Sequence, residues 1–135
     1  MVQSNPNSGK FSIVTGASTG IGLELAKHCA KEGYDLLIVA DEPAIHDAAE
    51  GLKALGNGNV EAIEADLSTT EGVDRLISAA KGRPVDHLLA NAGRGLGRAF
   101  LDQNWDEARR VVDTNIVGTI YLIHKIGNDM RQRGE

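Results

Sequence analysis

Residues 15–22, with the sequence Thr-Gly-Ala-Ser-Thr-Gly-Ile-Gly, constrain the fold of this 135-residue chain more than any other segment. They follow a short apolar run at 11–14 and precede a stretch with helical periodicity. Glycine permits a sharp turn and a close backbone approach, and peptide N–H groups at a helix start attract phosphate. We interpret the segment as a strand-loop-helix unit that binds a nucleotide pyrophosphate, although an ordinary glycine-rich connection has the same local pattern. The candidate binding residues are Gly16, Ser18, Thr19, Gly20, Ile21 and Gly22.

Apolar runs alternate with helical periodicity through the rest of the chain. They predict strands at 11–14, 34–40, 60–64 and 85–90, and helices at 20–31, 43–55, 68–80 and 104–133. The run at 34–40 is apolar at nearly every position, which is typical of a strand covered on both faces of a parallel sheet. One helix after each strand predicts a Rossmann-type α/β fold, a doubly wound three-layer α/β/α arrangement with strand order 3-2-1-4. We expect one domain over 11–135 and a flexible polar tail over 1–10.

Charge and cysteine content exclude several classes of protein. The net charge of −5 provides no basic surface for nucleic acid, and the single cysteine, Cys29, permits no internal disulfide. Cys29 repeats with Ile21 and Leu25 on one side of the first predicted helix, where it is expected to be buried. The four histidines have no metal-ligand spacing, so no metal site is predicted. No segment reaches the roughly 18–20 apolar residues of a membrane span and no signal-peptide pattern is recognised, so we expect a cytoplasmic protein without nucleic-acid or membrane partners.

Acidic residues follow the second and third predicted strands. Asp41 comes about 20 residues after the glycine segment, where an acidic group binds ribose hydroxyls. Asp41 and its neighbour Glu42 would repel a 2′-phosphate, so NAD is the predicted cofactor and NADP is less favoured; a solvated acidic turn is the alternative. Asp66 is a candidate acceptor for the adenine amino group, and Leu67 is a candidate donor through its N–H. Alternatively, these two residues only lead into a helix cap.

Four motifs occur in order along the chain, each where an expected element ends or, for the last, within the final helix. They are Thr15-Gly16-x-x-x-Gly20-Ile21-Gly22, Asp66-Leu67, Asn91-Ala92-Gly93 and Asn115. In this combination the chain resembles the short-chain dehydrogenase/reductase family over nearly its whole length. The resemblance implies hydride transfer between a nicotinamide cofactor and a small alcohol or carbonyl substrate. The doubled asparagine usual in the family is Ala90-Asn91 here.

The resemblance also implies roles for the later motifs. Asn91, Ala92 and Gly93 would brace the sheet and line the ribose and nicotinamide of the cofactor. Asn115 would hold a water molecule in a proton relay, which makes it the catalytic candidate. Asparagine is unfavourable inside a helix, which supports a role for Asn115 beyond packing, although a tolerated half-buried amide is the alternative.

The catalytic serine of the family and its tyrosine-lysine pair have no match in this chain. In the family they lie on strand five and the next helix, whereas the sequence ends at Gly134 and Glu135. Tyr121 and Lys125 have the Tyr-x-x-x-Lys spacing, but they share a helix with Asn115 and are not expected to converge with it on one substrate. We therefore expect the cofactor-binding half of an oxidoreductase, truncated before strand five. The alternatives are a non-catalytic dinucleotide-binding module, acting as a redox sensor or dimerising partner, and an inactive truncation.

The last predicted helix carries more apolar surface than one face of a sheet requires. Its main apolar arc is expected to cover the sheet and consists of Ala108, Val111, Val112, Ile116, Thr119, Leu122, Ile123 and Ile126. Val117 and Tyr121 fall outside that arc, beside Gly118, and indicate a second packing partner. Members of the family dimerise through this helix, so the resemblance implies a homo-oligomer.

Overall fold

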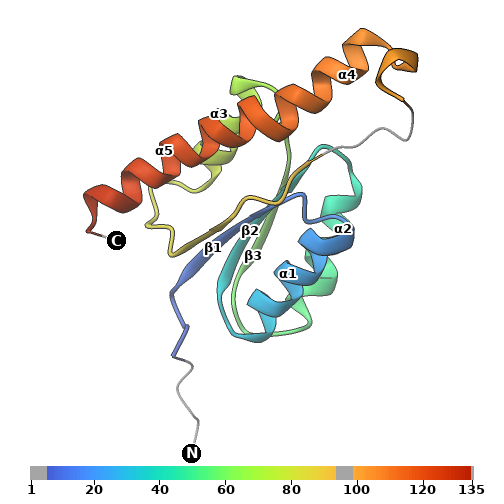
Figure 1. Cartoon of the computed structure of the whole chain (residues 1–135). Coiled ribbons are helices and arrows are strands. Elements are labelled where there is room, and N and C mark those ends of the chain that lie inside the picture. Colours follow the sequence, from blue (N-terminus) through green and yellow to red (C-terminus); the bar gives the residue numbers. More distant parts are fainter. Residues whose placement is uncertain (1–5, 94–98, 135) are drawn as a thin grey trace, which may run out of the picture.

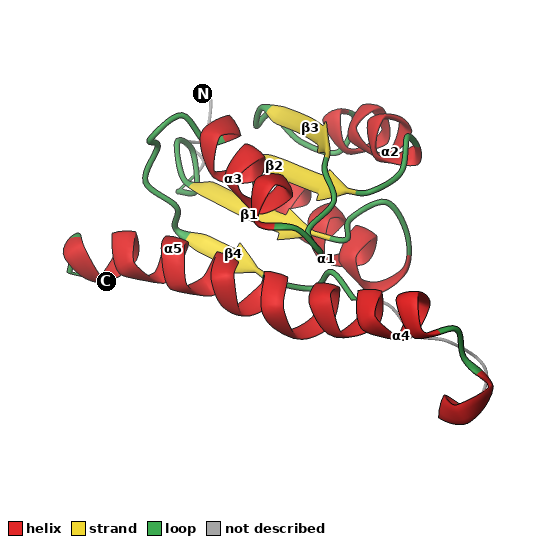
Figure 2. Ribbon diagram, turned by 90° about the horizontal axis from the view of Figure 1, so that it is seen from above, coloured by secondary structure: helices red, strands yellow, loops and turns green. Residues whose placement is uncertain are grey.

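The computed structural model describes residues 6–93 and 99–134 (Figure 1). Their elements are β1 (Phe11–Thr15), α1 (Gly20–Lys31), β2 (Asp35–Ala40), α2 (Ala44–Lys53), β3 (Val60–Glu64), α3 (Thr70–Ala79), β4 (His87–Leu89), the 3-10 turn η1 (Phe100–Asp102), α4 (Trp105–Val112), the π-helical turn η2 (Asp113–Gly118) and α5 (Thr119–Gln132). The described strands form one parallel sheet of order β3-β2-β1-β4 (Figure 2). This order confirms the predicted Rossmann-type fold.

The sheet separates two apolar cores, because successive side chains of a strand point to opposite faces. In β1, Ile13 packs in the core covered by α3 and α5, and Val14 packs in the core covered by α1 and α2 (Figure 1). In β2, Leu37 packs in the core covered by α3 and α5, and Leu36 packs in the core covered by α1 and α2. None of these four side chains is more than 2% exposed. Burial on both faces therefore explains why the central strands are apolar at successive positions.

Small residues form the buried face of α1. They are Gly22, Ala26, Cys29 and Ala30. The predicted burial of Cys29 is confirmed, but its predicted grouping with Ile21 and Leu25 was wrong, because Ile21 is 73% exposed and Leu25 is 36% exposed. An added Cβ at Gly22 would lie 2.1 Å from the carbonyl oxygen of Gly16. The helix is thus too close to the end of β1 for a large side chain on that face.

The predicted helix at 104–133 is continuous in outline but contains the π-helical turn η2 between α4 and α5 (Figure 2). A π turn holds one more residue than an α-helical turn, so it rotates the following residues by about 100° about the helix axis. The predicted apolar arc was therefore wrong in part. Leu122 and Ile126 are buried as expected, whereas Val112, Ile116 and Ile123 are 47–51% exposed.

Gly118 brings this helix against the connection between β3 and α3. An added Cβ at Gly118 would lie 1.8 Å from the carbonyl oxygen of Leu67, so no side chain fits there. Tyr121, on α5, is half-buried against the core between α5 and the sheet, and Val117 is 49% exposed. The exposed large apolar residues of the helix, from α4 to α5, are Trp105, Val112, Ile116, Val117, Ile120 and Ile123. An apolar surface of the helix therefore remains uncovered. It includes Val117, as the sequence indicated, but not the half-buried Tyr121.

β4 lies at one edge of the described sheet. β4 is shorter than its predicted range of 85–90 and, within residues 6–93 and 99–134, pairs with β1 alone.

Of the tail expected over 1–10, residues 1–5 lie outside the described residues. The described part makes hydrogen bonds with the rest of the chain. Asn7 Nδ2 donates to the Glu32 carbonyl at 2.8 Å, and Arg83 donates to the Gly9 carbonyl at 2.9 Å. The described helices include none with the length and apolar character needed to cross a bilayer.

Candidate functional site

A crevice of about 260 Å³ opens where β1, β2 and β3 end, which is the edge at which open parallel sheets bind ligands. Its lining residues are Gly16, Ser18, Thr19, Ala40, Asp41, Glu42, Ala65, Asp66, Leu67, Ala92, Gly93 and Thr114. Most of the cofactor residues predicted from the sequence are in this set. The predicted residues outside the lining are Gly20, Ile21, Gly22, Asn91 and Asn115.

Thr15, at the end of β1, joins the two glycine-containing loops of the crevice. It is 1% exposed, and its Oγ1 accepts hydrogen bonds from the N–H groups of Asn91 (2.9 Å) and Ala92 (2.8 Å). Asn91 Nδ2 donates in turn to the Gly16 carbonyl at 3.4 Å. Asn91 therefore connects the loops rather than lining the crevice. Sequence analysis missed the role of Thr15, although a hydroxyl at the end of an apolar strand is the signal that could have indicated it.

The three glycines of the first loop serve different purposes. Gly16 and Gly20 have φ angles of +67° and +61°, which favour glycine. An added Cβ at Gly16 would lie 2.9 Å from the Ala92 Cα, whereas one at Gly20 would meet nothing within 4 Å. Gly16 and Gly22 thus permit close packing inside the protein, and Gly20 leaves open space at the start of α1.

The first turn of α1 is suited to an anion. Thr19 occupies the N-cap position but makes no side-chain cap hydrogen bond, and no acidic residue lies in the first turn. Neither a hydroxyl of Thr19 nor a carboxylate of that turn therefore competes for the N–H groups of Gly20, Ile21 and Gly22. Such groups at a helix start carry partial positive charge and bind phosphate. The exposed side chain of Ile21 lies outside the crevice, so only its backbone suits a ligand role.

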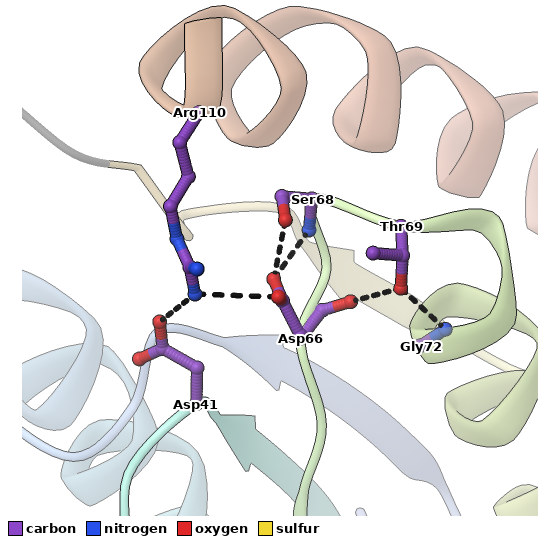
Figure 3. Close-up of polar contacts among 6 residues, drawn as sticks. All are labelled: Asp41, Asp66, Ser68, Thr69, Gly72 and Arg110. Carbon is purple, nitrogen blue, oxygen red and sulfur yellow. Dashed lines mark hydrogen bonds and ion pairs between the residues drawn. The ribbon is translucent and has the colours of Figure 1, made fainter. Parts of the chain in front are cut away.

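Carboxylates gather at the other end of the crevice, where β2 and β3 end. Glu42 accepts a 2.5 Å hydrogen bond from Ser18 Oγ. Arg110, on α4, projects between Asp41 and Asp66 (Figure 3). Its Nη2 lies 3.6 Å from Asp41 Oδ2 and 3.2 Å from Asp66 Oδ2. Sequence analysis missed Arg110, because its partners are distant along the chain and no local pattern relates them.

Asp66 is held in place by the start of the next segment (Figure 3). Its Oδ1 accepts hydrogen bonds from the N–H (2.9 Å) and the Oγ (2.6 Å) of Ser68. Burial alone would raise the pKa of the Asp66 carboxyl, but the Ser68 hydrogen bonds and the charge of Arg110 outweigh burial and lower that pKa below its ordinary value. The cap of α3 is Thr69, whose Oγ1 accepts from the Gly72 N–H at 3.0 Å, so the Asp66 carboxylate does not serve as that cap.

The π-helical turn contributes two polar residues near the second loop. Asn115 is exposed, and its Oδ1 would lie 3.2 Å from a Cβ added at Gly93. Thr114 lines the crevice and is 7% exposed, and its Oγ1 has no hydrogen-bond partner among the described residues. Sequence analysis missed Thr114. π turns occur often at functional sites, and this one contains both Thr114 and Asn115.

Tyr121 and Lys125 lie away from the crevice and contact α3 and each other. The Tyr121 hydroxyl donates to Asp74 Oδ1 at 2.8 Å, and Lys125 Nζ lies 5.5 Å from the centre of the Tyr121 ring. The hydrogen bond to Asp74 raises the pKa of Tyr121. A tyrosine that exchanges a proton near neutral pH needs the opposite shift, so this pair is a structural contact.

The chemistry of the crevice suits a dinucleotide. Thr19, the N-cap of α1, lines the crevice and brings the N–H groups of the first helical turn to its border, and the carboxylates of Asp41 and Asp66 line it as well. A pyrophosphate needs the first kind of group, and hydroxyl and amino donors of an adenosine need the second.

Comparison with known proteins gives consistent results. The chain matches the short chain dehydrogenase family over residues 10–135. An 11-beta-hydroxysteroid dehydrogenase-like protein, 4A, from Arabidopsis thaliana is 32% identical over 126 residues, which are 90% of this chain and 42% of that protein. An uncharacterized oxidoreductase, YmfI, from Bacillus subtilis is 37% identical over 119 residues, or 87% of this chain and 49% of that protein.

Solved structures resemble the chain to a similar extent. L-sorbose reductase from Gluconobacter frateurii, in complex with NADPH and L-sorbose, has a TM-score of 0.86 and 30% identity, covering 98% of this chain and 51% of that one. The bulky-bulky ketone specific alcohol dehydrogenase from Comamonas testosteroni has a TM-score of 0.84 and 26% identity, covering 93% of this chain and 51% of that one. The chain spans about half the length of the relatives it matches.

Proposed function

The chain belongs to the short-chain dehydrogenase/reductase family, and we propose that it is the cofactor-binding half of an NAD(P)-dependent oxidoreductase that interconverts an alcohol and a carbonyl compound. One observation carries this proposal: a single crevice is lined by Thr19, at a helix start without a side-chain cap, and by the carboxylates of Asp41 and Asp66. This is the distribution of donors and acceptors that a dinucleotide requires.

Each part of the cofactor has residues suited to it. The pyrophosphate would lie at the first turn of α1, beside Gly20, and the adenosine would lie against Asp41 and Asp66. The nicotinamide end would lie toward Ala92 and Gly93, the remaining part of the crevice lining. When bound, the nicotinamide supplies the position that gains or loses a hydride.

We assign Asn115 a role at the nicotinamide end. Its amide oxygen lies next to Gly93, and the family resemblance implies that it holds a water molecule that relays a proton. An amide both donates and accepts hydrogen bonds, so Asn115 can orient such a water without changing its own protonation.

Within this proposal NAD is preferred over NADP. Asp41 and Glu42 are exposed neighbours of the ribose position, and both would repel a 2′-phosphate. L-sorbose reductase, which resembles this chain, was solved with NADPH. The proposed preference for NAD therefore rests on Asp41 and Glu42 of this chain and not on the resemblance. Replacing Asp41 by Ala should weaken the binding of NAD more than that of NADP, and equal losses for both would contradict the preference.

The exposed apolar residues of the last helix support association with a second copy of the chain. Val112, Ile116, Ile120 and Ile123 are each at least 47% exposed, and they follow one another at helical spacing on α4, η2 and α5. Surfaces of this kind are commonly covered by a partner. The mass of the protein in solution, measured by sedimentation at several concentrations, tests this assignment.

Titration of the chain with NADH, followed by fluorescence, tests dinucleotide binding. Gly20→Val should abolish binding because it fills the open space at the start of α1. Gly82→Val is the matched control, since Gly82 has a similar φ angle of +69° and also has nothing within 4 Å of an added Cβ, but lies in the turn between α3 and β4, away from the start of α1. Wild-type protein that is folded but binds no dinucleotide would refute the proposal, and so would equal losses in the two variants. Binding without turnover by the whole protein would favour a non-catalytic sensor.

A further inference from the structure

We propose that Arg110 sets the balance between NAD and NADP by bridging the two carboxylates at the adenosine end of the crevice and by moving to a 2′-phosphate when one is present. This inference rests on the dinucleotide-binding function proposed above. It concerns a residue that neither the sequence motifs nor the crevice lining includes.

The contacts of Arg110 place it where an adenosine must be accommodated. One nitrogen, Nη2, lies 3.2 Å from Asp66 Oδ2 and 3.6 Å from Asp41 Oδ2 (Figure 3). The other oxygen of Asp66, Oδ1, already accepts two hydrogen bonds from Ser68. An adenine amino group that donates to Asp66 therefore competes with Arg110 for Oδ2. Adenosine binding requires Arg110 to give up at least part of this contact.

Exposure makes the bridge displaceable. The Arg110 side chain is 45% exposed, and those of Asp41 and Asp66 are 37% exposed. Ion pairs with this much solvent contact contribute little net stability, because water screens them and competes for the same groups. A ligand that supplies better donors to the carboxylates can thus displace the guanidinium at small cost.

Charge decides what the displaced guanidinium does. Asp41, Glu42 and Asp66 bring three carboxylates to this end of the crevice, and a 2′-phosphate would add further negative charge. Arg110 already reaches Asp41, the residue beside the ribose in the proposed complex. A guanidinium binds phosphate through paired hydrogen bonds. Arg110 can therefore interpose between Asp41 and a 2′-phosphate, whereas NAD gives it no such partner.

The two effects have opposite consequences for the two cofactors. Removing Arg110 frees Asp66 Oδ2, so NAD should bind as tightly as before or slightly more tightly. The same change removes the counter-charge of a 2′-phosphate, so NADP should bind more weakly. The loss of a charge-assisted hydrogen bond corresponds to about a tenfold loss of NADP affinity. The ratio of the two dissociation constants should shift toward NAD by at least this factor.

Calorimetric titration of Arg110→Gln with NAD and with NADP tests the inference. Arg110→Lys, which keeps the charge, should restore part of the NADP affinity. Arg109→Gln is the matched control, because Arg109 is the neighbouring cation on α4 but pairs with Asp113 at 3.7 Å. Equal weakening of NAD and NADP in Arg110→Gln would overturn the inference, since it would show that Arg110 only positions the carboxylates. An unchanged ratio would overturn it as well.

The failure of this inference is distinguishable from that of the proposed function. If the folded wild-type chain binds neither dinucleotide, both are wrong. If the wild type binds NAD and the ratio stays constant in Arg110→Gln, only the role of Arg110 is wrong. A carboxyl-carbon NMR titration of the protein without ligand gives an independent readout, because the pKa of Asp66 should rise in Arg110→Gln and remain constant in Arg109→Gln.

Discussion

Replacing Thr15 by Val tests whether one hydroxyl joins the two loops of the crevice. Valine has nearly the same shape as threonine but cannot accept a hydrogen bond. Thr15 is 1% exposed, and its Oγ1 accepts from the N–H groups of Asn91 and Ala92. In Thr15→Val the Ala92 N–H loses the hydroxyl that accepts from it, whereas the Asn91 N–H keeps the Leu89 carbonyl, to which it also donates at 3.0 Å.

The magnitude follows from the number and burial of these donors. An unsatisfied buried donor costs about 1–3 kcal/mol. Ala92 is half-buried and Asn91 keeps its second acceptor, so this cost applies once. The free energy of unfolding should therefore fall by about 2 kcal/mol in Thr15→Val. The matched control, Thr15→Ser, keeps the oxygen and loses one methyl group, which corresponds to about 1 kcal/mol.

Urea denaturation of the three proteins gives the comparison directly. With a typical slope of about 2 kcal/mol per molar urea, the midpoint of Thr15→Val should fall by about 1 M and that of Thr15→Ser by about 0.5 M. Amide spectra should show the resonances of Asn91 and Ala92 shifted in Thr15→Val and nearly unchanged in Thr15→Ser. Similar midpoints for the two variants would refute the reasoning, because the effect would then arise from packing and not from the hydroxyl.

Two further predictions concern the last helix and the acidic end of the crevice. Gly118→Ala should destabilise the protein by about 1–3 kcal/mol in urea denaturation, because its Cβ meets the Leu67 carbonyl. The control Gly127→Ala has open space around its Cβ and should stabilise the protein by about 0.5–1 kcal/mol. Destabilisation in both variants would contradict the close approach at Gly118. The pKa of Asp66 is lowered from 3.8, so ionised Asp66 stabilises the fold above that value and this contribution disappears as the pH falls through the lowered pKa. Acid titrations of stability should therefore show a shallower loss below about pH 5 in Asp66→Asn than in the wild type, and parallel curves would refute it.

The fold could be predicted because its information is local and repeated. Each central strand is apolar on both faces, as Ile13 and Val14 illustrate, and each strand is followed by a helix-forming segment. A parallel sheet covered on both sides is the arrangement that buries such strands. The position of the crevice follows from the same order, since the loops containing Gly16 and Asp41 come at the carboxyl ends of strands that lie side by side.

The faces of the helices were less predictable, because packing distance decides them. The sequence pattern favours large apolar side chains such as Ile21 and Ile116 for the buried face, yet both are exposed. The closest approaches occur at Gly22 and Gly118, where another backbone occupies the space of a side chain. The close approach at Gly118 lies at the end of the π turn η2, and a local sequence pattern does not record it.

The remaining parts of the site depend on partners far apart in the sequence. Arg110 meets carboxylates that follow β2 and β3, and Thr15 meets amides that follow β4. A single sequence identifies the type of each residue but not its neighbour across the fold. The motif residues were identifiable because a fixed local geometry, the glycine turn, accompanies them.

The extra residue in η2 sets the rotation of α4 relative to α5. Leu122 and Ile126 fix α5 on the sheet. The rotation of α4 about the helix axis therefore follows from the π turn between the two helices. Deleting one residue from the turn would restore a regular α-helix and swing α4 about its own axis by about 100°. Arg110 would then point away from Asp41 and Asp66. The reach of that guanidinium is thus determined by a single inserted peptide unit several residues further along the chain.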